Sequence, residues 1–214
     1  MKSKLVVVLT AVAMIVSLIQ PATATVVVTC QDLGGGVAQI SYDASDEAGV
    51  VAGFALNITV DNGATIESIF DYKTGLSTAA DPGYGVFPDW VVFVGDPGEV
   101  IYGGTPIVDP DSPDTPLPGL GTYGITVAMA AFYNLAVPAD APLVSDTLFK
   151  IAIDWNNATT VNVNIALNAT RGGIVMQGGA YPNSELLGST LIPEPATLLL
   201  LGLGGLMIRR RRAL

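Results

Sequence analysis

The stretch 161–168 alternates strictly between apolar side chains and small or amide side chains, and this pattern constrains the fold more than any other part of the sequence. The apolar positions are Val161, Val163, Ile165 and Leu167, and the positions between them are Asn162, Asn164, Ala166 and Asn168. Successive side chains of a β-strand point to opposite faces, so a period of two indicates a strand with one buried face. We therefore expect Ile165 to be buried and Asn164 to face water.

Eight further segments have strand character, because they are short, rich in β-branched or aromatic residues and bounded by turn residues. They are 25–29, 37–42, 54–60, 64–70, 90–94, 123–133, 143–155 and 173–177. The segment 54–60 alternates for its whole length and stops at the tight-turn sequence Asp61-Asn62-Gly63. Segment 64–70 is the expected partner strand, although Ile66 and Ile69 are out of phase in it.

The middle of the chain, 71–121, is irregular and surrounds one apolar island, Trp90–Val94, which we expect to be a short, well-buried strand. Asp81-Pro82-Gly83 and Asp96-Pro97-Gly98 are turn sequences, and 109–116 is an acidic loop stiffened by proline. Short strands, frequent turns and the lack of an amphipathic helix predict an all-β fold. The expected architecture is an antiparallel β-sandwich, of jelly-roll type or a related one.

The core also has a resemblance to known domains. Segments 51–61, 147–153 and 172–175 resemble, in their order, the strands of cohesin-like and carbohydrate-binding β-sandwich domains. This resemblance implies a cohesin-like variant of the sandwich and a binding role.

Residues 1–24 have the three parts of a secretory signal peptide. Lys2 and Lys4 are followed by a helical apolar stretch and by Ala22 and Ala24 in an Ala-x-Ala pattern, so signal peptidase is expected to cleave after Ala24. The alternative is a lipoprotein signal that ends at Cys30, but the residues before this cysteine lack the small side chain that such processing requires. Residues 25–191 then form the one expected domain.

The final segment, 192–214, contains Pro193, Glu194 and Pro195, an apolar run over 196–208, and the basic residues Arg209, Arg210, Arg211 and Arg212. The 13-residue run spans about 20 Å as a helix. A hydrocarbon core is about 30 Å thick, so this short hydrophobic helix suits a transient anchor in the inner membrane. The arginines resist translocation and act as a stop on the cytoplasmic side.

This arrangement closely resembles the PEP-CTERM sorting signal of bacteria that produce extracellular polysaccharide. The resemblance implies recognition by exosortase, a transpeptidase-like membrane protease, at Pro193, Glu194 and Pro195. An ordinary C-terminal membrane helix is the alternative, but such helices are usually longer.

The span 25–192 holds 18 acidic residues against Lys73, Lys150 and Arg171, for a formal charge of −15. Such a surface repels nucleic acid and anionic polymers, so we expect no nucleic-acid partner.

The chain has no histidine and one cysteine, Cys30, which we expect to be a small buried residue. The usual general base and zinc ligand are therefore missing, and no spacing of acids singles out a glycosidase pair, so we expect a protein that is not an enzyme.

No cofactor is expected, with one alternative. Asp109, Asp111 and Asp114 have the oxygen chemistry for calcium, but they lack the glycine and the terminal glutamate of an EF-hand loop, so a solvated loop is the preferred interpretation. The asparagines of three Asn-x-Thr sequences, Asn57, Asn157 and Asn168, are expected to face outward.

These features predict an exported, non-enzymatic protein of the cell envelope or extracellular matrix, sorted through its tail. The alternative is a cohesin-like or carbohydrate-binding module that recognises a protein partner or an extracellular polysaccharide. Sugar binding requires several exposed aromatic side chains in a row. The candidates are Tyr72, Tyr84, Phe87, Trp90, Tyr102 and Trp155.

Overall fold

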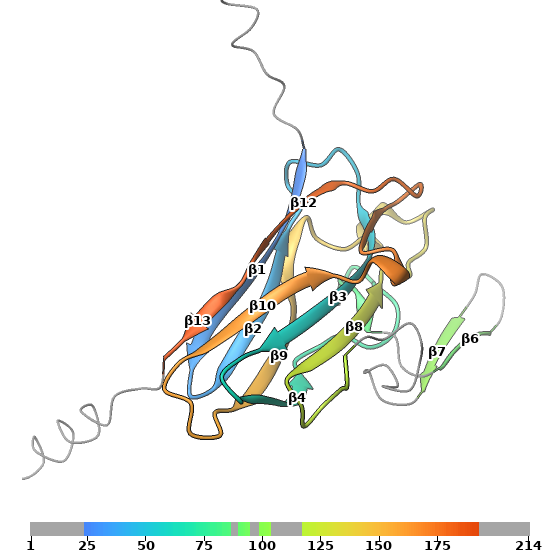
Figure 1. The fold of residues 1–214 in the computed structure, drawn as a ribbon. Coiled ribbons are helices and arrows are strands. Elements are labelled where there is room, and N and C mark those ends of the chain that lie inside the picture. Colours follow the sequence, from blue (N-terminus) through green and yellow to red (C-terminus); the bar gives the residue numbers. More distant parts are fainter. Residues whose placement is uncertain (1–23, 87–89, 95–98, 104–116, 193–214) are drawn as a thin grey trace, which may run out of the picture.

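The structure is a computed structural model that describes residues 24–86, 90–94, 99–103 and 117–192. In this part of the chain two β-sheets pack face to face, as Figure 1 shows. Sheet I has the order β12-β1-β2-β9-β4. Its strands are β1 (Thr25–Gly34), β2 (Val37–Asp43), β4 (Thr65–Phe70), β9 (Ser145–Asp154) and β12 (Asn183–Leu187).

Sheet II has the order β13-β10-β3-β8-β5, and β11 pairs with β3 beside this path. Its strands are β3 (Val51–Val60), β5 (Gly85–Val86), β8 (Gly124–Ala130), β10 (Val161–Leu167), β11 (Ile174–Met176) and β13 (Ser189–Leu191). Two short 3-10 helices, η1 (Pro138–Asp140) and η2 (Ala169–Arg171), lie in the connections. The predicted β-sandwich is confirmed.

The core lies between the sheets and consists of apolar side chains from the inward positions of each strand. Val28 and Ile40 of sheet I and Leu56 and Ile58 of sheet II are fully buried. In β10, Val161, Val163 and Ile165 are buried while Asn164 is exposed, as the alternation predicts. Burial of such side chains provides the main stabilisation, at about 25 cal/mol per Å² of apolar surface.

The partner predicted for 54–60 is wrong. β4 follows β3 in sequence but pairs with β9 in sheet I, whereas β3 pairs with β8 and β10 in sheet II. The turn between them, with Asn62 and Gly63 at positive φ, leads the chain from one sheet to the other. A bulge between Ile66 and Ser68 explains why Ile66 and Ile69 are out of phase yet both buried.

The pairing is not wholly antiparallel, because β1 and β12 run parallel. Neither β12 nor β13 was predicted from the sequence. Their short segments are polar, and one continuous stretch of chain supplies an edge strand to each sheet. Gly188 lies where the chain changes sheet, and a Cβ there would collide with the carbonyl oxygen of Val163.

The apolar island forms β6 (Trp90–Val94), as predicted, but it does not join either main sheet. It pairs with β7 (Glu99–Gly103), which was not predicted, in a separate two-stranded sheet (Figure 1). For β6 the structure describes the backbone alone, so the expected burial of its side chains stays a prediction. The helices predicted near the two chain ends also lie outside it. Across the described ranges, no helix has the length and apolar character needed to cross a membrane.

Candidate functional site

An open polar cleft of about 520 Å³ lies on the outer side of sheet I. One wall is formed by β2 and β9, which contribute Gln39, Asp146, Thr147 and Lys150. The other wall is the connection between β4 and β5, residues 71–84, which we call the 71–84 loop. Gln39 and Lys150 are directly opposite each other on adjacent strands, so their side chains share the outer face.

Two ion pairs line this cleft; the first joins its two walls, and the second lies within the 71–84 loop. Lys150 Nζ lies 2.8 Å from Asp71 Oδ2, and the side chains of Lys150 and Asp71 are 26% and 58% exposed. Lys73 pairs with Asp81, and their side chains are 10% and 74% exposed. Because the carboxylates are open to solvent, each pair contributes at most about 1 kcal/mol to folding. Their main effect is to place the mostly buried side chains of Lys73 and Lys150 beside aspartate side chains that are open to solvent.

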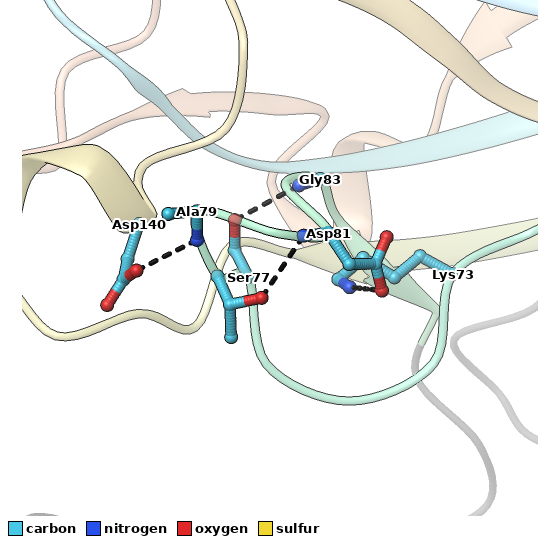
Figure 2. A network of polar contacts seen from close by, with 7 residues as sticks. Lys73, Ser77, Ala79, Asp81, Gly83 and Asp140 are labelled. Carbon is cyan, nitrogen blue, oxygen red and sulfur yellow. Dashed lines mark hydrogen bonds and ion pairs between the residues drawn. The ribbon is translucent and has the colours of Figure 1, made fainter.

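The 71–84 loop is held in place by hydrogen bonds from polar side chains to its backbone, as Figure 2 shows. The buried Ser77 accepts from the Gly83 N–H through Oγ at 3.0 Å, and Asp140 accepts from the Ala79 N–H at 2.9 Å. Gly83 has φ +142°, and an added Cβ would lie 3.2 Å from Cδ of Lys73. Glycine at this position therefore lets the loop backbone pack on the Lys73 stem.

Tyr84, a buried residue that lines the cleft, belongs to an aromatic cluster in the core. Its ring lies 4.9 Å from that of Phe54 and 5.3 Å from that of Tyr42, edge to face in both cases. Burial raises the pKa of Tyr42 to about 12, and burial also raises the pKa of Tyr84. Both phenols therefore stay protonated at neutral pH and serve as packing groups.

The exposed row of aromatic side chains predicted for sugar binding is not formed by the described candidates. Tyr84 is buried, and Tyr72 and Trp155 are partly buried and packed against the core. Tyr84 is therefore not open for stacking, whereas Tyr72 lines the polar cleft. Phe87 and the side chains of Trp90 and Tyr102 lie outside the described part of the structure.

The expected orientation of the three asparagines is correct for one and wrong for another. Asn157 is exposed in a turn and Asn57 is partly buried, but Asn168 is buried. Asn168 caps η2 by accepting from the Arg171 N–H at 3.1 Å, and its Nδ2 donates to Asn57 Oδ1 at 3.2 Å. Thr126 donates to the same oxygen at 2.7 Å. This shared network draws Asn168 inward at the end of β10.

Cys30 is partly buried rather than fully buried, and it packs at the edge of the core. Burial, with the nearby Asp32 carboxylate, raises the pKa of the Cys30 thiol to about 12. The thiol is therefore protonated at neutral pH, and a protonated thiol is a poor nucleophile.

The described residues contain no group of three or more side chains of metal-ligand type. The calcium candidates Asp109, Asp111 and Asp114 lie outside the described ranges, as does Ala22 of the signal-peptide pattern. The sorting residues Pro193, Glu194 and Pro195 and the arginines Arg209, Arg210, Arg211 and Arg212 lie outside them as well. Ala24 is described and directly precedes β1.

The described chain ends where this predicted tail begins. Leu191 in β13 is fully buried and pairs with Val161, whereas Ile192 is 64% exposed. Leu191 is therefore the last of the described residues that packs in the core.

Comparison with protein families shows that residues 191–212 match the PEP-CTERM protein-sorting motif. The matched range includes Pro193 to Pro195 and all four arginines. A search of curated proteins found no match.

Among solved structures, the chain is similar to one in the crystal structure of a CaDoc0917 variant in complex with CaCohA2 at pH 5.5. The two chains are 10% identical, the match covers 77% of this chain and 97% of the other, and the TM-score is 0.38. At this TM-score the likeness is loose, and the β-sandwich assignment rests on the sheets described above. The prediction of a PEP-CTERM sorting signal is confirmed by the family match.

Proposed function

We propose that the chain is an exported, non-enzymatic protein of the cell envelope or extracellular matrix, sorted through its C-terminal tail by an exosortase-type membrane protease. The observation that carries this proposal is the match of residues 191–212 to the PEP-CTERM protein-sorting motif. In this proposal signal peptidase removes 1–24 and the protein is exported. The run 196–208 then anchors it transiently in the inner membrane, and the arginines stay on the cytoplasmic side.

The boundary between sandwich and tail supports processing without loss of the fold. Among the described residues Leu191 is the last that is buried, so cleavage at or after Pro193 leaves β13 paired with β10. Cleavage before Leu191 would instead remove a fully buried leucine from the core. Loss of such a side chain costs about 2–5 kcal/mol.

The chemistry of the described side chains supports a non-enzymatic role. The chain has no histidine, the thiol of Cys30 is protonated at neutral pH, and Tyr42 and Tyr84 are packing groups with raised pKa values. The two lysines of the cleft are both paired with carboxylates. Neither the Cys30 thiol nor the two phenols have the lowered pKa of an activated nucleophile.

The test is the effect of Glu194→Ala on processing in a host that has an exosortase. Because this change damages the recognition triplet alone, we expect normal export and accumulation of unprocessed protein in the membrane fraction. Intact-mass measurement of the surface-extracted wild-type protein should show that the arginines have been removed.

Glu185→Ala is the matched control, because it removes an exposed glutamate from β12 without touching the tail. This variant should be processed like the wild type. Arginines that remain on the surface-extracted wild-type protein, or normal processing of Glu194→Ala, would contradict the proposal.

A further inference from the structure

We propose that the polar cleft between sheet I and the 71–84 loop binds a segment of a neutral, hydroxyl-rich saccharide. This inference goes beyond sorting, because it assigns a ligand class to the folded domain. The first observation is the distribution of charge. The span 25–192 has three basic residues, and two of them, Lys73 and Lys150, line this one cleft.

The charge balance of the cleft favours a neutral ligand. The two ammonium groups face three lining carboxylates, those of Asp71, Asp81 and Asp146. The surrounding domain carries a formal charge of −15, so an anionic polymer is repelled as it approaches. A hydroxyl-rich ligand has no charge to be repelled and keeps its full hydrogen-bonding capacity.

The described aromatic candidates form no exposed row, so the recognition proposed here rests on hydrogen bonds in place of ring stacking, and the lining groups match hydroxyl chemistry. A hydroxyl group donates one hydrogen bond and accepts others, so it can accept from an ammonium while it donates to a carboxylate. Lys150 and Asp71 present these two partners 2.8 Å apart, and Lys73 and Asp81 repeat the arrangement on the 71–84 loop. Gln39 adds an amide beside Lys150, and Thr147 adds a hydroxyl on β9. Hydrogen bonds with a charged partner are about twice as strong as neutral ones.

The cleft is preorganised on both sides. One wall is a pair of hydrogen-bonded strands, β2 and β9. The other is pinned at Ser77 and Ala79 by the hydrogen bonds in Figure 2. Binding therefore orders few further groups, and ordering is one of the main costs of association. The volume of about 520 Å³ falls within the roughly 300–1,000 Å³ of small-ligand sites.

The cleft lies toward the end of the sandwich opposite Leu191, the last residue of β13. β13 ends at Leu191, which pairs with Val161 just after the turn that follows Asp154. The cleft residues Asp146 to Lys150 are at the other end of β9, and Figure 1 shows β13 and the start of β1 at opposite ends. The cleft therefore lies away from the point where the described chain ends.

The test is isothermal titration calorimetry of the full chain, purified in detergent. The probes are soluble neutral glucan, mannan and galactan oligosaccharides, with polygalacturonate as the anionic comparison. We expect at least one neutral probe to bind. Lys150→Gln and Asp71→Asn should each weaken that binding by about tenfold, because each change removes one partner of the charged pair.

Glu185→Gln is the matched control, because it removes one charge from an exposed position of β12 outside the cleft, and its affinity should equal that of the wild type. Circular dichroism and the denaturation midpoint report whether each variant is folded. If Lys150→Gln or Asp71→Asn does not fold, Thr147→Ala takes its place as a cleft variant.

The proposal is overturned if no neutral probe binds, if the cleft variants bind with the affinity of the wild type, or if polygalacturonate binds more strongly than the neutral probes. A cleft that binds only a protein partner would overturn it as well. The processing of the tail is measured separately by mass, so failure of either proposal is recognised on its own.

Discussion

Strand β10 and the 71–84 loop are both ordered parts of this molecule, but different forces hold them. In β10 the apolar side chains of Val161, Val163 and Ile165 are buried between the sheets. In the 71–84 loop the ordering contacts are hydrogen bonds that backbone N–H groups donate to Ser77 and Asp140, and an ion pair between Lys73 and Asp81. Apolar burial leaves a periodic signature in a sequence, whereas side-chain to backbone bonds do not.

The largest expected effect is in β10. Ile165→Ala should lower the free energy of unfolding by about 2–5 kcal/mol, because it removes buried methyl groups and leaves a cavity. Asn164→Ala, one position away on the exposed face, should change it by less than about 0.5 kcal/mol. Chemical denaturation of the two variants measures the contrast. Equal shifts of the two midpoints would show that β10 does not have one buried face.

Most of the sandwich strands were predictable because each carries its own pattern. The alternation is visible residue by residue and corresponds to burial over 56–60 in β3 and over 161–165 in β10, whereas Ala55 and Asn168 are buried against it. Strand pairing was not predictable in the same way, since β4 follows β3 through a tight turn and still joins the other sheet. The short polar strands β12 and β13 depend on neighbours distant in sequence, β1 and β10, which no local pattern reveals.

The sorting tail and the polar cleft also differ in how far each can be predicted from local sequence. The sorting tail is a contiguous motif, so its residues were predicted from the sequence, and the family match confirms the motif. The cleft combines Lys150 with Asp71, which are 79 positions apart. The sequence does contain one hint of the cleft, because Lys73 and Lys150 are two of the three basic residues in a very acidic domain. Their proximity, however, is a property of the tertiary fold.

A smaller effect is expected in the 71–84 loop. Ser77→Ala should lower the free energy of unfolding by about 1–3 kcal/mol, because it leaves the Gly83 N–H without the acceptor that Ser77 Oγ provides at 3.0 Å. Thermal or chemical denaturation measures this change. The same variant should weaken saccharide binding in the cleft, since the hydrogen bond holds one wall.

Thr78→Ala is the matched control for Ser77→Ala. Thr78 also bonds to the loop backbone, through Oγ1 to the Asp81 N–H at 3.2 Å, but the Thr78 carbonyl accepts from the same N–H at 3.1 Å. Removing the hydroxyl therefore leaves that N–H with a partner, and we expect a change below about 0.5 kcal/mol. A loss in Thr78→Ala as large as that in Ser77→Ala would show that the lost acceptor of the Gly83 N–H is not the cause of the destabilisation.

The smallest expected effect concerns the turn after β3 and depends on pH. Asp61 accepts from the Asn162 backbone N–H at 2.8 Å and from Asn162 Nδ2 at 2.7 Å, and these hydrogen bonds hold the pKa of the Asp61 carboxyl below its usual value. A lowered pKa means that the carboxylate favours the folded state above the unfolded-state pKa of about 3.9. This contribution is lost as the pH falls through the lower folded-state pKa.

The variant Asp61→Asn keeps one acceptor oxygen and removes the charge, so it isolates this contribution. We expect the denaturation midpoint of the wild type to exceed that of Asp61→Asn at neutral pH, and the difference to shrink as the pH falls below about 4. The size of the effect is limited, because Asp61 lies at the surface, where solvent screens its interactions. Denaturation curves recorded between pH 7 and pH 2 measure the difference. Midpoints that stay parallel over that whole range would mean that the charge of Asp61 does not stabilise the start of β10, and that apolar burial alone holds this strand.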